Sequence, residues 1–182
     1  MHKYYRIFFN LILGASVFAL GLAYILEYAY ELQPCHFCYY QRWIYYGVAS
    51  TCIVGLLSNF LITTRFGIMT RVVDRFISYI IVLLIFCNMS MGFMHLSSEK
   101  RWFHFSTSCT STDMGFSKAE TLDQFRDLML KREVVSCDHV QWTLFRISLA
   151  GWNFIYSAVL FVFSLIFSIC FTRNIRYEED TK

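Results

Sequence analysis

The sequence predicts an all-α membrane protein, a four-transmembrane-helix bundle, and three observations support this fold class. The chain of 182 residues is 57% hydrophobic and 19% aromatic, above the apolar share of about 45–50% in soluble domains. Four apolar runs come close to or exceed the ~20 residues with which a helix crosses a bilayer. Internal repeats, low-complexity segments and Pro/Gly linkers are absent from the sequence. We therefore expect residues 1–182 to form a single membrane domain.

The first apolar run covers about residues 7–26 and follows the basic residues Lys3 and Arg6. It is long for the apolar core of a signal peptide, so we interpret it as a retained transmembrane helix. Gly14 and Gly21 lie seven residues apart within it. Small residues at a helix surface allow close approach, so we expect a neighbouring helix to pack there.

Three further runs, at about residues 43–62, 76–94 and 147–171, complete the predicted bundle. Three loops separate the four runs, and two of them are of interest. The loop at about 27–42 is short, and the loop at about 95–146 is long and polar. We expect both of these loops to lie on the same side of the membrane, because two spans separate them.

The long loop is expected to contain a short amphipathic helix. Ser117-Lys118-Ala119-Glu120 has the pattern of a capping box, and Leu122, Phe125 and Met129 follow at helical spacing with charged residues between them. Such a helix lies either along the membrane surface or folded onto the top of the bundle.

The distribution of Lys and Arg predicts which side each end faces. The N-terminus, the loop between the second and third runs and the C-terminal segment are basic, whereas residues 27–34 contain no Lys or Arg. The positive-inside rule then places both termini in the cytoplasm. The loops at about 27–42 and 95–146 would face the outside or a periplasm, which is where disulfides form and persist.

The seven cysteines divide by their depth in this topology. Three lie inside apolar runs, and we interpret them as small buried packing residues: Cys52, Cys87 and Cys170. Four lie at or beyond the ends of the runs, in the two loops predicted to face outward: Cys35, Cys38, Cys109 and Cys137. The chemistry of the chain is therefore expected to involve these four.

The pair Cys35 and Cys38 follows the single proline of the chain, Pro34. A helix that begins near Pro34 needs no N–H from that residue. Its free N–H groups and positive dipole end would point at the two thiols and favour a reactive thiolate. Arg42 falls on the same helical face as the two cysteines, at spacing i, i+3, i+7. The Cys-x-x-Cys pattern alone also fits half of a zinc site or two packing residues.

The two cysteine pairs differ in spacing, and this difference favours a thiol–disulfide relay. One pair is compact and lies at a helix start, whereas Cys109 and Cys137 are widely spaced in the long loop. In a relay, one pair has to reach a partner protein while the other stays beside an electron acceptor. A zinc site made of all four cysteines stays open at this point.

Several segments resemble the DsbB family, the quinone-linked membrane oxidases that regenerate the periplasmic disulfide donor DsbA. The segment Cys35-His36-Phe37-Cys38-Tyr39-Tyr40-Gln41-Arg42 is similar to the family pattern C-x-x-C-x-x-x-R. The segments His95-Leu96-Ser97-Ser98-Glu99 and Ser148-Leu149-Ala150-Gly151-Trp152-Asn153 are similar to the stretches that follow the third helix and open the fourth. Two positions depart from the family: Arg146 replaces a residue that is usually small, and the loop around Thr107-Ser108 lacks a frequent proline. Arg146 would pair with Asp138 or with a lipid head group, or would contact the quinone region.

The resemblance implies a relay of four cysteines. A reduced, periplasmic DsbA-like protein of the thioredoxin fold would attack a Cys109–Cys137 disulfide at Cys109. Cys137 would then attack the Cys35–Cys38 disulfide at Cys35, and Cys38 would be released as a thiolate beside a quinone. A resting bond between Cys35 and Cys137 is an alternative state. The enzyme would be a quinone-dependent protein-disulfide oxidoreductase, with ubiquinone or menaquinone as its electron acceptor.

The resemblance also implies cofactor-binding residues. Arg42 offers rigid donors to a quinone oxygen, or its side chain only extends to lipid head groups. His95 would have a quinone or proton role, or would be an ordinary interfacial histidine. The aromatic residues of the second helix would form a quinone wall or the usual interfacial belt: Phe37, Tyr39, Trp43, Tyr45 and Tyr46. The chain would reside in the bacterial inner membrane, in contact with the lipid bilayer, with its active cysteines on the periplasmic side.

Two other functions remain under consideration. A metal-binding or metal-transporting membrane protein could use the four extracytoplasmic cysteines as soft ligands, although the helix interiors lack the acidic and histidine ligands of a transport path. A relay similar to vitamin K epoxide reductase would have its cysteine pairs in the opposite order along the chain. We expect no resident metal, and the absence of a basic tract in a chain of net charge +3 gives no indication of nucleic-acid binding.

Overall fold

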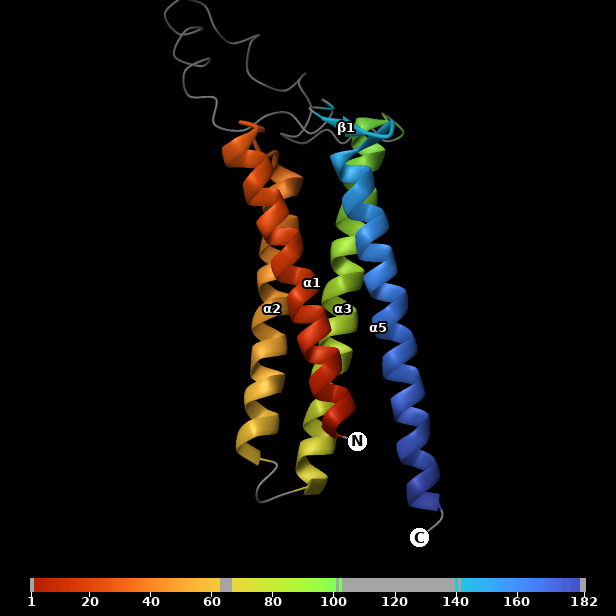
Figure 1. The fold of residues 1–182 in the computed structure, drawn as a ribbon. Helices are drawn as coiled ribbons and strands as arrows, with labels where there is room; N and C mark the ends of the chain where they lie inside the picture. Colours follow the sequence, from red (N-terminus) through yellow and green to blue (C-terminus); the bar gives the residue numbers. More distant parts are fainter. Residues whose placement is uncertain (1, 63–66, 101, 103–139, 141, 181–182) are drawn as a thin grey trace, which may run out of the picture.

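The computed structural model describes residues 2–62, 67–100, 102, 140 and 142–180. Within these residues the chain forms four long helices and one short hairpin (Figure 1). The elements are α1 (His2–Ala29), α2 (His36–Ile62), α3 (Gly67–Glu99), β1 (Thr143–Leu144), β2 (Ile147–Ser148) and α5 (Leu149–Asp180). The expected amphipathic helix, Cys109 and Cys137 lie outside the described residues.

The four helices of the described part are all long and apolar enough to cross a membrane. The spanning segments are Lys3–Ala29, His36–Phe60, Val72–Glu99 and Leu149–Cys170. The prediction of a four-helix membrane bundle is therefore confirmed, and the chain is a multi-pass membrane protein. The hairpin is the one element of the described part that the all-α prediction did not include.

The helices extend beyond the apolar runs from which they were predicted. The second helix begins at His36, so residues 36–42 of the loop expected at about 27–42 are helical and carry Cys38 and Arg42. The fourth helix begins at Leu149, because Ile147 pairs with Leu144 in the hairpin. Hydropathy marks only the apolar part of a helix, whereas the backbone hydrogen bonds continue into polar sequence.

The main core lies in the half of the bundle that contains the start of α1 (Figure 1). The rings of Phe8 on α1 and Phe167 on α5 stack in parallel with centroids 4.1 Å apart. Between these helices and α2 and α3, the core is made of the buried residues Tyr5, Phe8, Phe9, Ile12, Val48, Cys52, Ile77, Ile81 and Ile85. Dispersion between closely packed side chains stabilises such a core, because lipid is as apolar as the side chains themselves.

Two expectations about helix faces were wrong. Gly14 and Gly21 have no neighbouring atom within 4 Å of an added Cβ, so none of the described helices packs on them. The close approach occurs instead at Gly92 of α3, where a Cβ would lie 3.2 Å from the Cα of Phe154 on α5. Of the three cysteines expected to be buried, Cys52 is buried, whereas the other two are exposed on the outer surface of the bundle. These two are Cys87 and Cys170.

A chain of hydrogen bonds links three helices in the middle of the bundle. The Tyr45 hydroxyl of α2 donates to Asn153 Oδ1 of α5 over 2.9 Å and lies 3.2 Å from Ser157 Oγ. Asn88 Nδ2 of α3 donates to the same Ser157 oxygen over 2.8 Å. Interhelical bonds of this kind stabilise membrane bundles by about 0.6–2 kcal/mol each, and here they fix α2, α3 and α5 below the cysteine pair.

The hairpin lies at the end of the bundle opposite to the one where α2 ends and α3 begins (Figure 1). Its two strands pair antiparallel, with Thr143 opposite Ser148. Phe145 and Arg146 form the turn and both have positive φ, 52° and 65°, which is the backbone of a type I′ turn. Trp152 Nε1 donates to the Leu144 carbonyl over 3.1 Å and attaches the hairpin to α5.

Candidate thiol–disulfide site

The first helical turn of α2 places a thiol at the positive end of the helix dipole. Pro34 precedes this turn, and Cys35 occupies the N-cap position, with its carbonyl accepting the Tyr39 N–H over 3.2 Å. The Cys38 N–H points at Cys35 Sγ over 3.4 Å. The sulfur of Cys35 thus takes the place of the oxygen that caps most helices. This environment stabilises negative charge on the sulfur.

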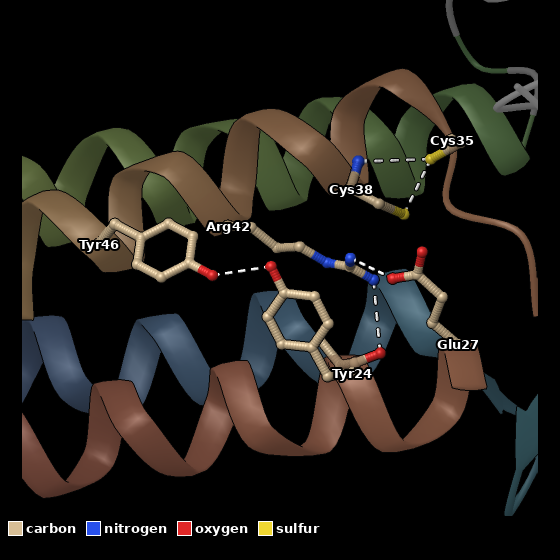
Figure 2. A network of polar contacts seen from close by, with 7 residues as sticks. Tyr24, Glu27, Cys35, Cys38, Arg42 and Tyr46 are labelled. Carbon is tan, nitrogen blue, oxygen red and sulfur yellow. Dashed lines mark hydrogen bonds and ion pairs between the residues drawn. The ribbon is translucent and has the colours of Figure 1, made fainter. Parts of the chain in front are cut away.

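The two sulfur atoms of the pair lie 2.9 Å apart (Figure 2). A disulfide bond is about 2.05 Å long, so a small side-chain rotation is enough to form it. Cys35 is 3% exposed, and Cys38 is half-buried. The Cys-x-x-Cys spacing therefore places two thiols close enough to form a disulfide by side-chain rotation.

His95 of α3 contacts the cysteine pair from the neighbouring helix. Its Nε2 lies 3.4 Å from Cys35 Sγ and 4.0 Å from the Glu99 carboxylate one turn further along α3. Its ring lies 5.6 Å from that of Phe37. The side chain is buried, and Nδ1 has no hydrogen-bond partner among the described residues. The histidine is thus positioned to exchange a proton with Cys35.

The Arg42 side chain extends toward α1 within the bundle. It is 11% exposed and forms an ion pair with Glu27 of α1 (Figure 2). Its second terminal nitrogen donates to the Ala23 carbonyl over 3.3 Å. The guanidinium carbon also lies 4.8 Å from the centre of the Tyr24 ring and 5.8 Å from that of Tyr39, within the range of cation–π attraction.

Glu27 was missed as a site residue because the sequence places it in a loop. The sequence nevertheless contained a signal that Glu27 needs a cationic partner. An acidic residue at the end of an apolar run is costly to bury without a cation, and residues 27–34 contain none. Its partner therefore had to come from another element, and Arg42 is the first cation along the chain after it.

These residues border one cavity of about 440 Å³ between α1, α2, α3, α5 and the hairpin. The reactive groups on its wall are Cys35, Cys38, Arg42, Glu27 and His95. Much of the remaining wall is apolar and includes Phe18, Leu22, Leu26, Leu144, Leu149, Trp152 and Tyr156. The volume is typical of a site for a small organic molecule.

Two side-chain amides on the cavity wall have donors without an acceptor in the described part of the chain. They are Nε2 of Gln41, whose side chain is 6% exposed, and Nδ2 of Asn153. An unsatisfied buried donor costs about 1–3 kcal/mol. A flat apolar molecule that carries acceptor oxygens would fill the cavity and satisfy these donors.

The aromatic residues of α2 separate into two groups. Tyr45 lines the cavity. Trp43, Tyr39 and Tyr46 are 71%, 41% and 40% exposed and lie on the outer surface, where the interfacial belt of a membrane protein is found. The rest of the cavity wall comes from α1, α5 and the hairpin, which sequence reasoning did not connect with the site.

The thiol pair and His95 could also hold a metal ion. One sulfur or nitrogen atom from each of Cys35, Cys38 and His95 lies within 4.8 Å of the others. Zn²⁺ takes sulfur ligands at about 2.3 Å and imidazole nitrogen at about 2.0 Å. The two sulfurs would have to move apart for both to bind one tetrahedral ion.

A helical membrane bundle with a closely spaced cysteine pair at a helix N-terminus, open to an apolar cavity, is typical of membrane thiol–disulfide oxidoreductases. Comparison with known proteins identifies the family. The model of the family described as "Disulfide bond formation protein DsbB" matches residues 5–167. The chain therefore belongs to the DsbB family and is a disulfide bond formation membrane protein, which confirms the resemblance seen in the sequence.

One curated relative is similar over most of its length. The uncharacterized protein RP370 of Rickettsia prowazekii (strain Madrid E) is 20% identical over 159 residues, which cover 87% of this chain and 85% of the relative. No solved structure matches the chain.

Proposed function

We propose that this protein reoxidises a periplasmic DsbA-like thiol oxidase and passes the electrons to a membrane quinone. The observation that carries the proposal is the single cavity onto which Cys35, Cys38, Arg42 and His95 all open. Membership in the DsbB family supports the disulfide chemistry. The apolar wall and the lateral position between membrane helices support a lipid-soluble acceptor.

The cavity fits a quinone by the chemistry of its donors. The unsatisfied Gln41 and Asn153 amides and the Arg42 guanidinium offer hydrogen bonds to ring oxygens, while apolar side chains cover the ring. A bound quinone supplies a two-electron, two-proton acceptor, either ubiquinone or menaquinone. The Cys35–Cys38 dithiol would close to a disulfide as it loses two electrons and two protons. His95, at 3.4 Å from Cys35 Sγ, is positioned to receive the proton of that thiol.

The outer half of the relay involves Cys109 and Cys137, which lie outside the described residues. In the proposal, a thiolate of the thioredoxin-fold partner attacks the Cys109–Cys137 disulfide at Cys109, and the second partner thiol releases the oxidised partner. The freed Cys137 thiolate attacks Cys35, Cys38 leaves as a thiolate, and Cys109 then resolves the mixed disulfide. Each transfer moves one electron pair inward, toward Cys35 and Cys38, and one disulfide outward, toward the partner.

The proposed orientation places the cysteine pair on the periplasmic side of the bacterial inner membrane. The cysteine pair and the starts of α1 and α3 lie at opposite ends of the bundle (Figure 1). Basic residues concentrate at the opposite end from the cysteines, which supports cytoplasmic termini. We propose that residues 1–182 act as one membrane domain in this orientation.

Thiol trapping in membranes tests the proposal. Wild-type protein and single Cys→Ala variants at positions 35, 38, 109 and 137 would be reduced, incubated with or without quinone, and alkylated. We expect quinone to protect four thiols in wild type, because the Cys35–Cys38 disulfide passes to Cys109 and Cys137 and then forms again. It should protect two thiols in variants at 109 or 137, and none in variants at 35 or 38. Equal protection of the thiols with and without quinone would contradict the proposal.

A metal-binding function is the second candidate, because three ligand atoms of Cys35, Cys38 and His95 come together. It would use these residues instead of the four cysteines considered from sequence. Metal analysis of the purified protein discriminates between the two. Stoichiometric zinc that a chelator must remove before Cys35 and Cys38 can be alkylated would favour it over the redox function.

A further inference from the structure

We propose that Glu27 is a positioning residue that holds the Arg42 guanidinium against the wall of the cavity. The inference rests on the proposed function, because the cavity is taken to be the quinone site. It assigns a role to a residue of α1, whereas the reactive cysteines and Arg42 belong to α2. It also explains how the charged Arg42 side chain, which is 11% exposed, can remain buried.

Both terminal nitrogens of Arg42 contact groups of α1. One terminal nitrogen pairs with the Glu27 carboxylate, and the other donates to the Ala23 carbonyl over 3.3 Å. Glu27 and Ala23 are four residues apart and therefore one turn apart on the same helix. The Tyr24 ring lies 4.8 Å from the guanidinium carbon. The side chain, which leaves α2, is thus held at both terminal nitrogens by α1 (Figure 2).

The burial of the two charges makes this pairing matter. The side chains of Arg42 and Glu27 are 11% and 22% exposed, and both border the cavity. The other ionisable groups on the cavity wall are the thiols of Cys35 and Cys38, the pair His95 and Glu99, and the phenols of Tyr45 and Tyr156. Removal of one partner from a buried ion pair leaves the other without compensation. Glu27 therefore compensates the buried charge of Arg42 and keeps the guanidinium in place.

A fixed guanidinium is a better receptor than a mobile one. Arg carries five N–H donors in a rigid plane, so donors remain for an acceptor oxygen after those given to Glu27 and Ala23. Binding a ligand to a side chain that is already ordered avoids the entropy cost of ordering it. Loss of Glu27 should therefore weaken quinone binding without removing any group that touches the reacting sulfur atoms.

The test compares Glu27→Gln with Glu31→Gln in the full-length purified protein. Glu31 is exposed and lies four residues along the chain, beyond the end of α1, so the control removes the same charge with the same change of shape. Binding of a short-chain ubiquinone analogue would be followed by quenching of tryptophan fluorescence. We expect the Kd to rise about ten-fold in Glu27→Gln, the loss of one charge-assisted hydrogen bond. It should stay unchanged in Glu31→Gln.

Steady-state kinetics and a charge swap separate positioning from folding. In Glu27→Gln the quinone KM should rise with the Kd while kcat changes little. The double variant Glu27→Arg/Arg42→Glu restores an ion pair between the same helices but moves the guanidinium to α1. We expect it to recover the unfolding temperature lost by either single change, while quinone binding stays weak. Recovery of tight quinone binding by the swap would overturn the inference.

Two further outcomes separate this inference from the proposed function. Equal quinone Kd values in Glu27→Gln and Glu31→Gln, with tight binding by wild type, would overturn the role of Glu27 alone. Failure of wild type to bind the analogue would overturn the proposed function and this inference with it. If Glu27→Gln does not fold, Glu27→Asp keeps the charge with a shorter reach, and an unchanged Kd there would count against positioning.

Discussion

The half of the bundle near the start of α1 and the half near the cysteine pair are built from the same four helices but enclose different interiors. Near the start of α1, aromatic and branched side chains fill the space, with Phe8 and Phe167 stacked at 4.1 Å. Near the cysteine pair, the helices enclose about 440 Å³ bordered by an ion pair, a histidine and two thiols. Close packing stabilises a membrane bundle, so a cavity on this scale costs stability and indicates a site.

Two buried cysteines show what the difference between the halves teaches. Cys52 is 0% exposed and Cys35 is 3% exposed, so burial does not distinguish them. Cys52 packs among apolar side chains of the core. Cys35 instead accepts an N–H at a helix start and lies 3.4 Å from His95. Reactivity therefore depends on the neighbours of a thiol and on its access to a cavity.

The largest expected effect comes from removing a thiol in the cavity half. Cys38→Ala should lower quinone-dependent oxidation of the partner by at least about 1,000-fold, because loss of a reacting group leaves no alternative route. The fold should remain, since the side chain is small. Oxygen-free assays with quinone measure the loss. Cys52→Ala is the matched control and should retain the rate per folded molecule, so an equal loss in both would remove the distinction.

The next largest effect is on the unfolding free energy and comes from the packed half of the bundle, near the start of α1. Phe9 is fully buried in the core, and Phe9→Ala should cost about 3–5 kcal/mol of unfolding free energy through lost contacts and a cavity. Unfolding in mixed micelles measures the change. The folded fraction should oxidise its partner at the wild-type rate. A large drop in that rate, with unchanged unfolding, would show that the two halves are not separable.

Arg42 is expected to have an intermediate effect in the cavity half. Arg42→Ala should keep the fold and raise the quinone KM by about 10–100-fold, the range for a hydrogen bond from a charged group. The quinone KM of Arg42→Lys should lie between those of wild type and Arg42→Ala, because Lys keeps the charge but not the planar pair of donors. KM values from quinone titrations check this. An unchanged KM in the alanine variant would count against quinone binding by Arg42.

The smallest expected effect lies at the hairpin tip. Arg146 has φ of 65°, a conformation that costs residues other than glycine about 1 kcal/mol. Arg146→Gly should therefore raise the unfolding free energy by up to about 1 kcal/mol. Arg146→Ala removes the charge but keeps the Cβ and should give no such gain. An equal gain in both variants would assign the effect to charge instead of backbone strain.

The left-handed backbone at Arg146 accounts for the small residue expected at this position, and it does not explain why this chain has arginine instead. A small residue was expected at this position, and a type I′ turn favours glycine or asparagine there. The side chain is exposed. The proposed pairing of Arg146 with Asp138 stays a prediction, because Asp138 lies outside the described residues.

Sequence alone determined the parts of this protein that depend on neighbouring residues. Four spans follow from the length and hydropathy of each run. The helix start beside Pro34 and the shared face of Cys35, Cys38 and Arg42 follow from local geometry. These features need no partner, because the hydrogen bonds of a helix are formed within it.

Only the tertiary structure decided which faces of the helices meet. Membrane helices are apolar on every side, so their sequences carry little periodic signal for the buried face. For this reason, packing at Gly14 and burial of Cys87 were predicted wrongly. His95 reaches Cys35 across 60 residues of chain, and Glu27 reaches Arg42 from another helix. The rotation of each helix about its own axis brings these groups to one cavity, and that rotation is set by packing between helices.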